Sequence, residues 1–241
     1  KTAQIFRQKT KTKGINREEA FDLKYLKLDE PEIIQYTDNL LVNNSCFFRQ
    51  YVLGEDSPQI RAVSKIISKT LQQPFYTEMR TNQQLGYIVW SYTNNLDETH
   101  FLNFLIQSGV YPADELNRRA DEFIISSAEI INSMDSETFH QVVDSIIEEL
   151  EKTPMSIAER ARKLKTYIFE HDADYLRDQD TIESLRTIDK ETVSNLLDST
   201  VSPQSRRMVN ILTFAENHEN TTKVKNSFSN LDTWKASRAY K

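Results

Sequence analysis

Residues 80–89 read Arg-Thr-Asn-Gln-Gln-Leu-Gly-Tyr-Ile-Val, and no other stretch constrains the fold of this chain as much. The stretch begins as a polar segment that carries Arg80 and Gly86, and an apolar run starts at Tyr87. A glycine directly before such a run predicts a backbone position that needs either positive φ or a close approach by neighbouring atoms. The pattern therefore predicts the end of a helix, a tight turn and a strand that opens with a hydrogen-bonding phenol.

The rest of the chain alternates between strand and helix patterns. Short apolar runs predict strands at residues 46–53, 87–92, 101–107 and 207–214. Apolar residues at helical spacing predict helices at 58–72, 116–131, 139–150 and 157–168, with shorter ones at 182–185 and 191–197. Ser57 is placed to cap the first helix, and Asp135 or Ser136 the third. Pro74 is predicted to end or kink the first helix, and the polar residues 93–98 to form a hairpin loop.

The order of these elements is a strand, a helix, two strands, several helices and a strand. It predicts an α+β fold, with a mixed or antiparallel sheet and helices packed on one face. Residues 45–215 are expected to form this α/β unit, and residues 1–44, which are polar and weakly periodic, are interpreted as a lead-in from a preceding domain. Residues 216–241 are expected to form a polar C-terminal segment. The chain begins with Lys1 rather than Met, which indicates a processed product or a fragment.

Composition narrows the classes of function. The 241 residues have a formal net charge of -6 and a pI of about 5.4, which argues against general binding to a phosphate backbone, so no nucleic-acid partner is expected. No apolar run approaches the ~20 residues that a membrane-spanning helix needs. Cys46 is the single cysteine, which excludes an internal disulfide, and its apolar neighbours predict a buried structural thiol.

Several catalytic motifs are missing from the sequence. The histidines are His100, His140, His171 and His218, and no two of them are four residues apart. None can therefore pair on one helical face as zinc ligands, and no metal site is expected within this chain. Glycine occurs only at positions 14, 54, 86 and 109, so the sequence holds neither a phosphate-binding P-loop nor a dinucleotide fingerprint.

The ordered set of residues around Gly86 resembles a known family. The kink expected at Pro74, then Arg80 and the run from Gln84 to Val89, is similar to the Arg-x-x-x-Gln-Leu-Gly-Tyr segment of pitrilysin/insulinase-type zinc metallopeptidases. That segment lies in the C-terminal half of those enzymes. The likeness covers roughly residues 40–215, and it implies the last of four α/β homology units, without the zinc motif.

The resemblance implies a division of labour between two halves of a larger enzyme. The family encloses a chamber between the halves, and zinc, its ligands and the general-base Glu lie in the N-terminal half. The C-terminal half contributes an Arg and a Tyr that reach the substrate, and Arg80 and Tyr87 occupy those motif positions here. The resemblance therefore implies that Arg80 and Tyr87 bind a peptide substrate and that Tyr87 has a catalytic role as a hydrogen-bond donor. It also implies that this chain holds no cofactor and that zinc belongs to the N-terminal half.

The chemistry of the two side chains suits such roles. Peptide hydrolysis develops negative charge on the former carbonyl oxygen, and a neutral phenol can donate a hydrogen bond to it. An Arg fork can hold a neighbouring substrate carbonyl and fix its register. Each residue also has a plainer interpretation, because Arg80 could complement a helix dipole and Tyr87 could open a strand, where aromatic residues are common.

Two hypotheses from different classes follow. In the first, the chain is the C-terminal, substrate-contacting unit of a zinc-dependent peptidase that degrades peptides within a closed chamber. Its partner is then the N-terminal catalytic half of the same or another chain, and the chain alone is expected to be inactive. In the alternative, the chain is a non-catalytic structural or assembly subunit of the same family. Retention of both Arg80 and Tyr87 favours the first hypothesis.

Overall fold

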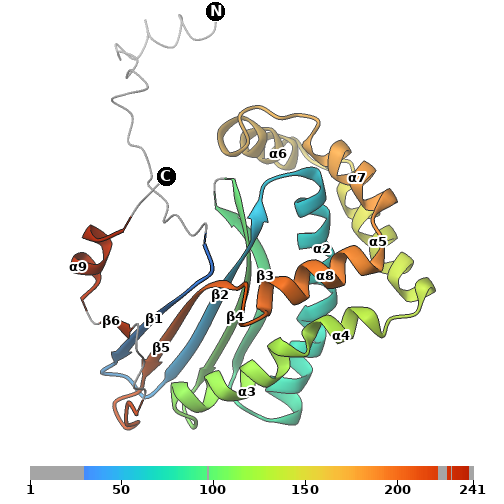
Figure 1. Cartoon of the computed structure of the whole chain (residues 1–241). Coiled ribbons are helices and arrows are strands. Elements are labelled where there is room, and N and C mark those ends of the chain that lie inside the picture. Colours follow the sequence, from blue (N-terminus) through green and yellow to red (C-terminus); the bar gives the residue numbers. More distant parts are fainter. Residues whose placement is uncertain (1–29, 97, 222–226, 229, 239–241) are drawn as a thin grey trace, which may run out of the picture. The chain divides into compact units, whose positions relative to one another are not determined.

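The computed structural model describes residues 30–96, 98–221, 227–228 and 230–238 (Figure 1). One compact unit contains the sheet and the helices from α2 to α8. The short helix α9 (Leu231–Ala236) falls almost entirely in a second unit.

The centre of the fold is a mixed sheet with the strand order β3-β4-β2-β5-β1-β6. Its strands are β1 (Glu32–Asn39), β2 (Ser45–Glu55), β3 (Ile88–Leu96), β4 (Thr99–Ser108), β5 (Arg207–Phe214) and β6 (Ser227–Phe228). The pairs β3–β4, β4–β2 and β2–β5 are antiparallel, whereas β1 is parallel to both β5 and β6.

The helices cover one face of this sheet (Figure 1). They are α2 (Pro58–Tyr76), η2 (Thr77–Asn82, a π-helix), α3 (Ala113–Ile125), α4 (Ser127–Asn132), α5 (Ser136–Glu151), α6 (Ile157–Glu170), α7 (Arg177–Thr187) and α8 (Lys190–Val201). The predicted α+β class, with a mixed sheet and helices on one face, is therefore confirmed.

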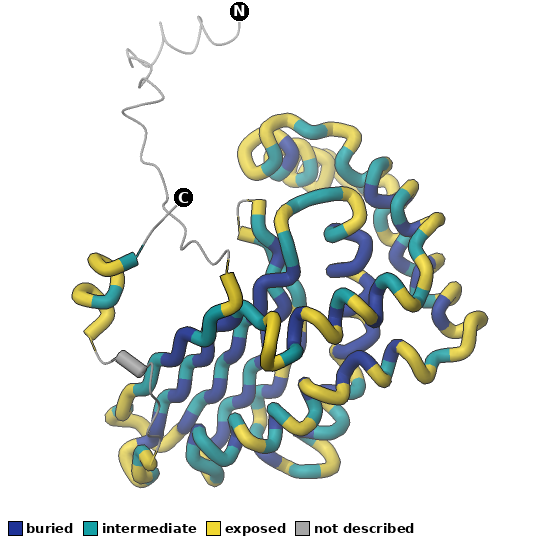
Figure 2. Tube along the Cα trace, viewed as in Figure 1, coloured by how far each residue is buried: buried dark blue, intermediate teal, exposed yellow. Residues whose placement is uncertain are grey.

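The core lies between the sheet and α2. Alternate side chains of β2, such as Phe47 and Tyr51, point toward the helices and are fully buried. Ile66, Ile67 and Leu71 of α2 are fully buried against them, as helical spacing predicts. Figure 2 shows this division, with buried residues concentrated on α2 and the sheet and exposed residues along α6.

The polar ends of the described chain contain strands that no local pattern predicted. Residues 32–39 were assigned to the lead-in 1–44, but they form β1, which pairs with β5 along its whole length. The C-terminal segment likewise contributes β6, which pairs with β1. Both strands are held by backbone hydrogen bonds to neighbours distant in sequence, so a local apolar pattern is not needed to form them. Residues 1–29 of the lead-in lie outside the described residues.

The first helix continues through Pro74, where an end or a kink was predicted. Pro74 lies inside α2 and does not end it, and the helix then widens into η2, where Gln83 N–H donates to the Glu78 carbonyl at 3.0 Å. Phe75 and Met79, on either side of this junction, are fully buried. Their burial holds the helical path past a residue that lacks a backbone donor.

The hairpin after η2 is tighter than predicted. β3 continues to Leu96 and β4 starts at Thr99, so most of the expected loop 93–98 is strand. The side chain of Asn103 donates to Asn94 Oδ1 at 2.7 Å across the pair. Side-chain pairing of this kind extends a ladder through residues that favour turns in isolation.

Candidate functional site

The signature residues 80–89 form a turn between η2 and β3. The Leu85 N–H donates to the Met79 carbonyl at 2.9 Å, and the Leu85 side chain is almost fully buried. Gln84 has a φ of 53°, in the left-handed region that residues other than glycine seldom adopt. The predicted sequence of helix end, tight turn and strand is therefore confirmed, with the turn anchored to the last turns of the helix.

Gly86 is required by a close approach and not by positive φ. A Cβ at this position would lie 1.9 Å from the Gln107 carbonyl oxygen of β4. No side chain fits at that distance, so only glycine lets the turn pass against β4. Ile88 then pairs with Gln107 as the first residue of β3.

Glu78 secures the other side of the turn. Its carboxylate accepts hydrogen bonds from the side-chain amides of Asn82 and Gln83, each at 2.8 Å. These bonds favour the charged form and lower the pKa of Glu78 below its ordinary value. Glu78 was not among the residues predicted from the sequence, although it lies four and five residues before the two amides, a spacing that a helical path brings together.

Arg80 and Tyr87 lie against each other at the ends of this turn. The Arg80 guanidinium carbon lies 5.6 Å from the centre of the Tyr87 ring, within cation–π range. The Tyr87 side chain is 85% exposed. Among the described residues, neither the guanidinium nor the phenol oxygen has a hydrogen bond or ion pair. The donors of the partly exposed Arg80 and the hydroxyl of the exposed Tyr87 are therefore available to a ligand.

The sheet face opposite the helices continues from this pair as an apolar surface. Trp90 and Tyr92 of β3 project from it and are 57% and 38% exposed. Strand register aligns one residue from each of five strands in a row across this face: Trp90, Leu105, Phe48, Ile211 and Tyr36. Such a row offers an apolar wall beside the free donors of Arg80 and Tyr87.

The ligand sets that zinc requires are built from His, Cys, Asp and Glu side chains. No group of three His, Cys, Asp or Glu side chains stands in ligand geometry within the part of the chain that the structure describes. His100 Nε2 lies 2.7 Å from Asp56, and His218 Nδ1 lies 2.8 Å from the Ser45 hydroxyl, so both rings have protein partners.

Cys46 differs from the expected buried thiol. It lies on β2 and is partly exposed. The burial that it has raises the pKa of the thiol, which keeps it protonated at neutral pH.

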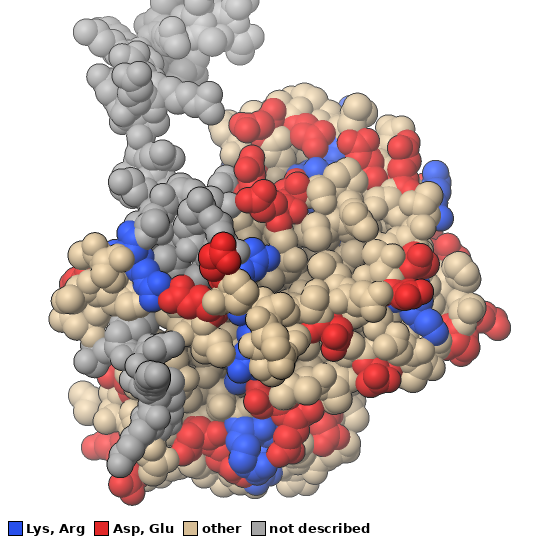
Figure 3. All heavy atoms as spheres, in the orientation of Figure 1, with Lys and Arg blue, Asp and Glu red and all other residues tan. Residues whose placement is uncertain are grey.

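Charge is mixed over the surface. In the view of Figure 3, Asp and Glu side chains spread over the helices, with Lys and Arg in small groups among them.

Among the described residues, no helix has both the length and the apolar character to cross a bilayer.

Sequence comparisons place the chain beside peptidases. Residues 66–165 match the family model described as PQQ synthase PqqF-like, C-terminal lobe domain 4. Protease 3 of Salmonella typhi is 28% identical over 112 residues, which cover 46% of this chain. Insulin-degrading enzyme of Homo sapiens is 27% identical over 154 residues, or 63% of this chain. The chain spans 12% and 15% of the lengths of these two relatives.

Solved structures share the fold. A crystal structure of pitrilysin superposes with a TM-score of 0.82 at 17% identity, covering 99% of this chain and 26% of that one. The peptidase M16 inactive domain from Pseudomonas fluorescens gives a TM-score of 0.59 at 13% identity, covering 85% and 49%. The matching family model, the named relatives and this fold agree with the resemblance seen at residues 80–89. These findings together support the assignment of the chain to the pitrilysin/insulinase family of peptidases, as a C-terminal unit.

Proposed function

We propose that this chain is the C-terminal, substrate-contacting unit of a zinc-dependent peptidase that degrades peptides within an enclosed chamber. One observation carries the proposal: Arg80 and Tyr87 lie together at 5.6 Å with their polar groups unpartnered among the described residues. Packing or capping roles would place these groups against protein atoms. An exposure of 85% for Tyr87 supports an encounter with a substrate.

In this proposal the two side chains have separate roles. The Tyr87 hydroxyl donates a hydrogen bond to the oxygen on which negative charge develops as the peptide bond is attacked. The Arg80 fork holds a neighbouring substrate carbonyl and sets the register of the peptide. The ring of Tyr87 also supports the guanidinium through its face, which limits the conformations that Arg80 samples.

Preorganisation supports the catalytic role. Glu78 bonds Asn82 and Gln83 on one side of the turn, and Gly86 seats the other side against β4. The backbone that carries the donors is therefore fixed before a substrate arrives, which limits the reorganisation needed during the reaction. The apolar row beside them would bury apolar side chains of a peptide.

The proposal assigns zinc and the general base to an N-terminal half, because the described residues of this chain do not fit a metal. When bound there, zinc would polarise the scissile carbonyl. Donors that stand on the opposite half complete the site only when the halves close, so closure would control turnover.

The test is made in the enzyme assembled with its N-terminal half. Tyr87→Phe removes one donor and keeps the ring, so we expect turnover to fall ~10²–10³-fold while the melting temperature is unchanged. Arg80→Lys loses the planar fork and should act mainly through a higher KM. Tyr175→Phe, at a Tyr that is 56% exposed on the loop before α7, is the matched control and should keep normal turnover.

The same measurements separate the alternatives. Lower stability with normal turnover per folded molecule would assign both residues to packing. An assembled protein that cleaves no peptide, with or without the substitutions, would favour the structural or assembly subunit.

A further inference from the structure

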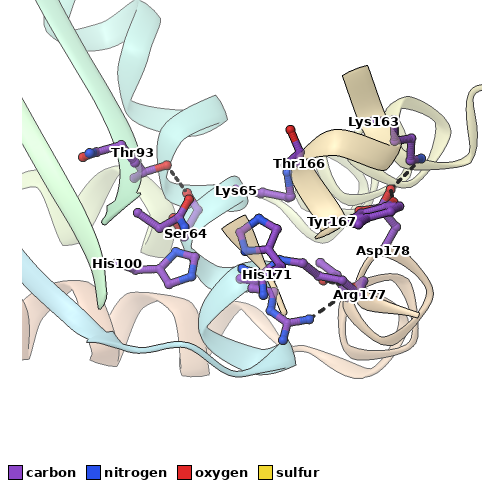
Figure 4. Close-up of a pocket in the computed structure, with 14 residues that line it drawn as sticks. Ser64, Lys65, Thr93, His100, Lys163, Thr166, Tyr167, His171, Arg177 and Asp178 are labelled. Atoms are coloured by element: carbon purple, nitrogen blue, oxygen red, sulfur yellow. Dashed lines mark hydrogen bonds and ion pairs between the residues drawn. The ribbon is translucent and has the colours of Figure 1, made fainter. Parts of the chain in front are cut away.

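A polar cavity of about 420 Å³ lies at the far end of β3 from Tyr87. Figure 4 shows its walls, which include Ser64 and Lys65 from α2, Thr93 from β3 and Lys163 from α6. Every side chain that lines it is polar. Thr93 follows Tyr87 by six residues along an extended chain, so the cavity is about 20 Å from the proposed substrate site.

One wall of the cavity is an ion-pair cluster around Asp56. Arg177 donates from both terminal nitrogens to the Asp56 carboxylate, each at 2.7 Å, and Arg61 bonds to it at 2.9 and 3.1 Å. His100 Nε2 lies 2.7 Å from the same carboxylate. Burial alone would raise the pKa of Asp56, but the bonds from Arg177, Arg61 and His100 outweigh it and hold the pKa below its usual range. These groups satisfy one another and so form a fixed wall.

Lys65 and Ser64 differ from this wall because no hydrogen bond holds the Lys65 ammonium or the Ser64 hydroxyl among the described residues, although the charge of Lys65 helps to lower the pKa of Asp178. In the described part of the chain, no carboxylate lies within ion-pair distance of Lys65. Ser64 is 5% exposed, and none of the described residues bonds its hydroxyl, although its carbonyl accepts from Thr93 Oγ1 at 3.2 Å. A nearly buried hydroxyl gains free energy when it finds a partner, and a ligand in the cavity would supply one.

The charge of the lining favours an anion. Its permanent cations are Arg61, Lys65, Lys163 and Arg177. Asp178 pairs with Lys163 at 2.6 Å, Asp56 lies behind the arginines, and Asp174 lies 3.8 Å from Arg61. These three carboxylates offset three of the four cations, and Lys65 and Lys163 both act on Asp178, so one positive charge remains in excess beside this carboxylate.

We propose that this cavity binds a small organic phosphate whose body carries hydroxyl groups, as a sugar phosphate does. The phosphate would lie between Lys65 and Lys163 and accept from the Ser64 hydroxyl, in charge-assisted bonds that exceed neutral ones in strength. Asn94 and Thr166 offer amide and hydroxyl groups for the rest of the ligand. No aliphatic residue lines the cavity, so an apolar ligand would gain little by burial there.

Such a ligand would also attach α6 to the body of the unit. Tyr167 is the one buried residue of α6. Its hydroxyl donates to Asp178 at 2.6 Å, and Lys163 pairs with the same carboxylate. A phosphate held by Lys65 on α2 and Lys163 on α6 would add a second bridge between the helices.

Isothermal titration calorimetry of the whole 241-residue chain tests the proposal, at constant ionic strength and with glucose 6-phosphate, inorganic phosphate and glucose as probes. We expect saturable one-to-one binding of glucose 6-phosphate, weaker binding of inorganic phosphate and none of glucose. Lys65→Gln and Ser64→Ala should each weaken binding about tenfold, because each removes a direct contact to the phosphate. Lys69→Gln is the matched control, since Lys69 lies one turn further on α2 and pairs with Glu149 at 3.6 Å.

Three outcomes would overturn the proposal. They are no saturable binding of either phosphate at millimolar concentration, affinity that Lys65→Gln and Ser64→Ala leave unchanged, and glucose binding equal to that of its phosphate. Neither the Lys65 ammonium nor the Ser64 hydroxyl makes a hydrogen bond or ion pair among the described residues. The unliganded variants should therefore have the same melting temperature as the wild type, which thermal unfolding measures. Neither the binding nor its test requires peptidase activity, so the result is independent of the roles of Arg80 and Tyr87.

Discussion

At the scale of single residues, Glu78 and Gly86 set the backbone positions of Arg80 and Tyr87. Glu78 gathers the two amides that follow it, and Gly86 lets the turn touch the backbone of β4. Neither residue has a side chain that would reach a substrate beyond the turn. Both act by fixing the backbone that carries the donors, which is the requirement that preorganised hydrogen bonding imposes.

Gly86→Ala tests this arrangement. The added Cβ would overlap the Gln107 carbonyl oxygen at 1.9 Å, so β3 and β4 must separate at their first pair. We expect a loss of about 1–3 kcal/mol in the free energy of unfolding, measured by urea denaturation. Gly109→Ala is the control, because its nearest atom, the Asn43 carbonyl oxygen, lies 3.3 Å away. Equal stability of the two variants would show that the close approach at Gly86 is not a constraint.

At the scale of elements, α2 connects the signature turn with the polar cavity. Its C-terminal end continues through Pro74 into η2 and the turn. Near its N-terminal end, Arg61 joins Asp56 and Arg177 in the cluster that attaches α7. Side chains from α2, the start of β4 and α7 meet at one carboxylate, so that carboxylate holds three elements together.

Asp56→Asn should therefore destabilise the unit by about 3 kcal/mol, because the buried Arg61 and the part-buried Arg177 lose their counter-charge. The pKa of Asp56 is lowered by folding, so its contribution is fully present above pH ~4 and is lost as the pH falls through the folded value. Urea denaturation from pH 7 to 3 should show the difference from wild type narrowing below pH ~4. Glu149→Gln, which breaks the exposed pair with Lys69, should cost under ~1 kcal/mol. A difference that grows in acid would contradict this account.

At the scale of the whole molecule, α6 and the residues just before it expose an apolar surface, called the α6 surface below. We define it by Met155, Ile157, Leu164, Ile168 and Phe169, which are between 40% and 91% exposed. Apolar residues at helical spacing normally face a core, and this surface has none among the described residues. The chain spans 12% of protease 3 of Salmonella typhi and 26% of the pitrilysin chain. Most residues of these relatives therefore have no counterpart in this chain.

Given the proposed function, the α6 surface should contact the N-terminal half of the parent peptidase. In sedimentation velocity, mixing the chain with that half should give a complex that Ile157→Glu with Phe169→Glu weakens at least tenfold. The isolated variant should melt normally, because both side chains are mostly exposed, at 91% and 77%. Lys165→Glu, also on exposed α6, is the control and should leave the complex intact. A complex indifferent to the double substitution would place the contact elsewhere.

Local physical chemistry made much of the fold predictable. Ser57 and Asp135 cap α2 and α5 through bonds to the third backbone amide after them, as their sequence positions predict. β1 was missed because its stability comes from pairing with β5, more than 160 residues away in sequence. Pro74 does not end α2, one of the two outcomes predicted for it, because the burial of Phe75 and Met79 outweighs a local breaker.

The candidate substrate site was proposed from the resemblance of residues 80–89 to a family segment, because Arg80 and Tyr87 taken singly are equally well explained by capping and packing. The structure brings the two side chains together, since one helix–turn–strand path connects them. Two of its properties emerge only from the folded chain: the polar groups of the pair have no partners among the described residues, and Gly86 is needed for contact with Gln107. The polar cavity depends on tertiary structure even more. Lys65 and Lys163 are nearly 100 residues apart, and only packing of α6 and α7 beside α2 brings their charges to one cavity.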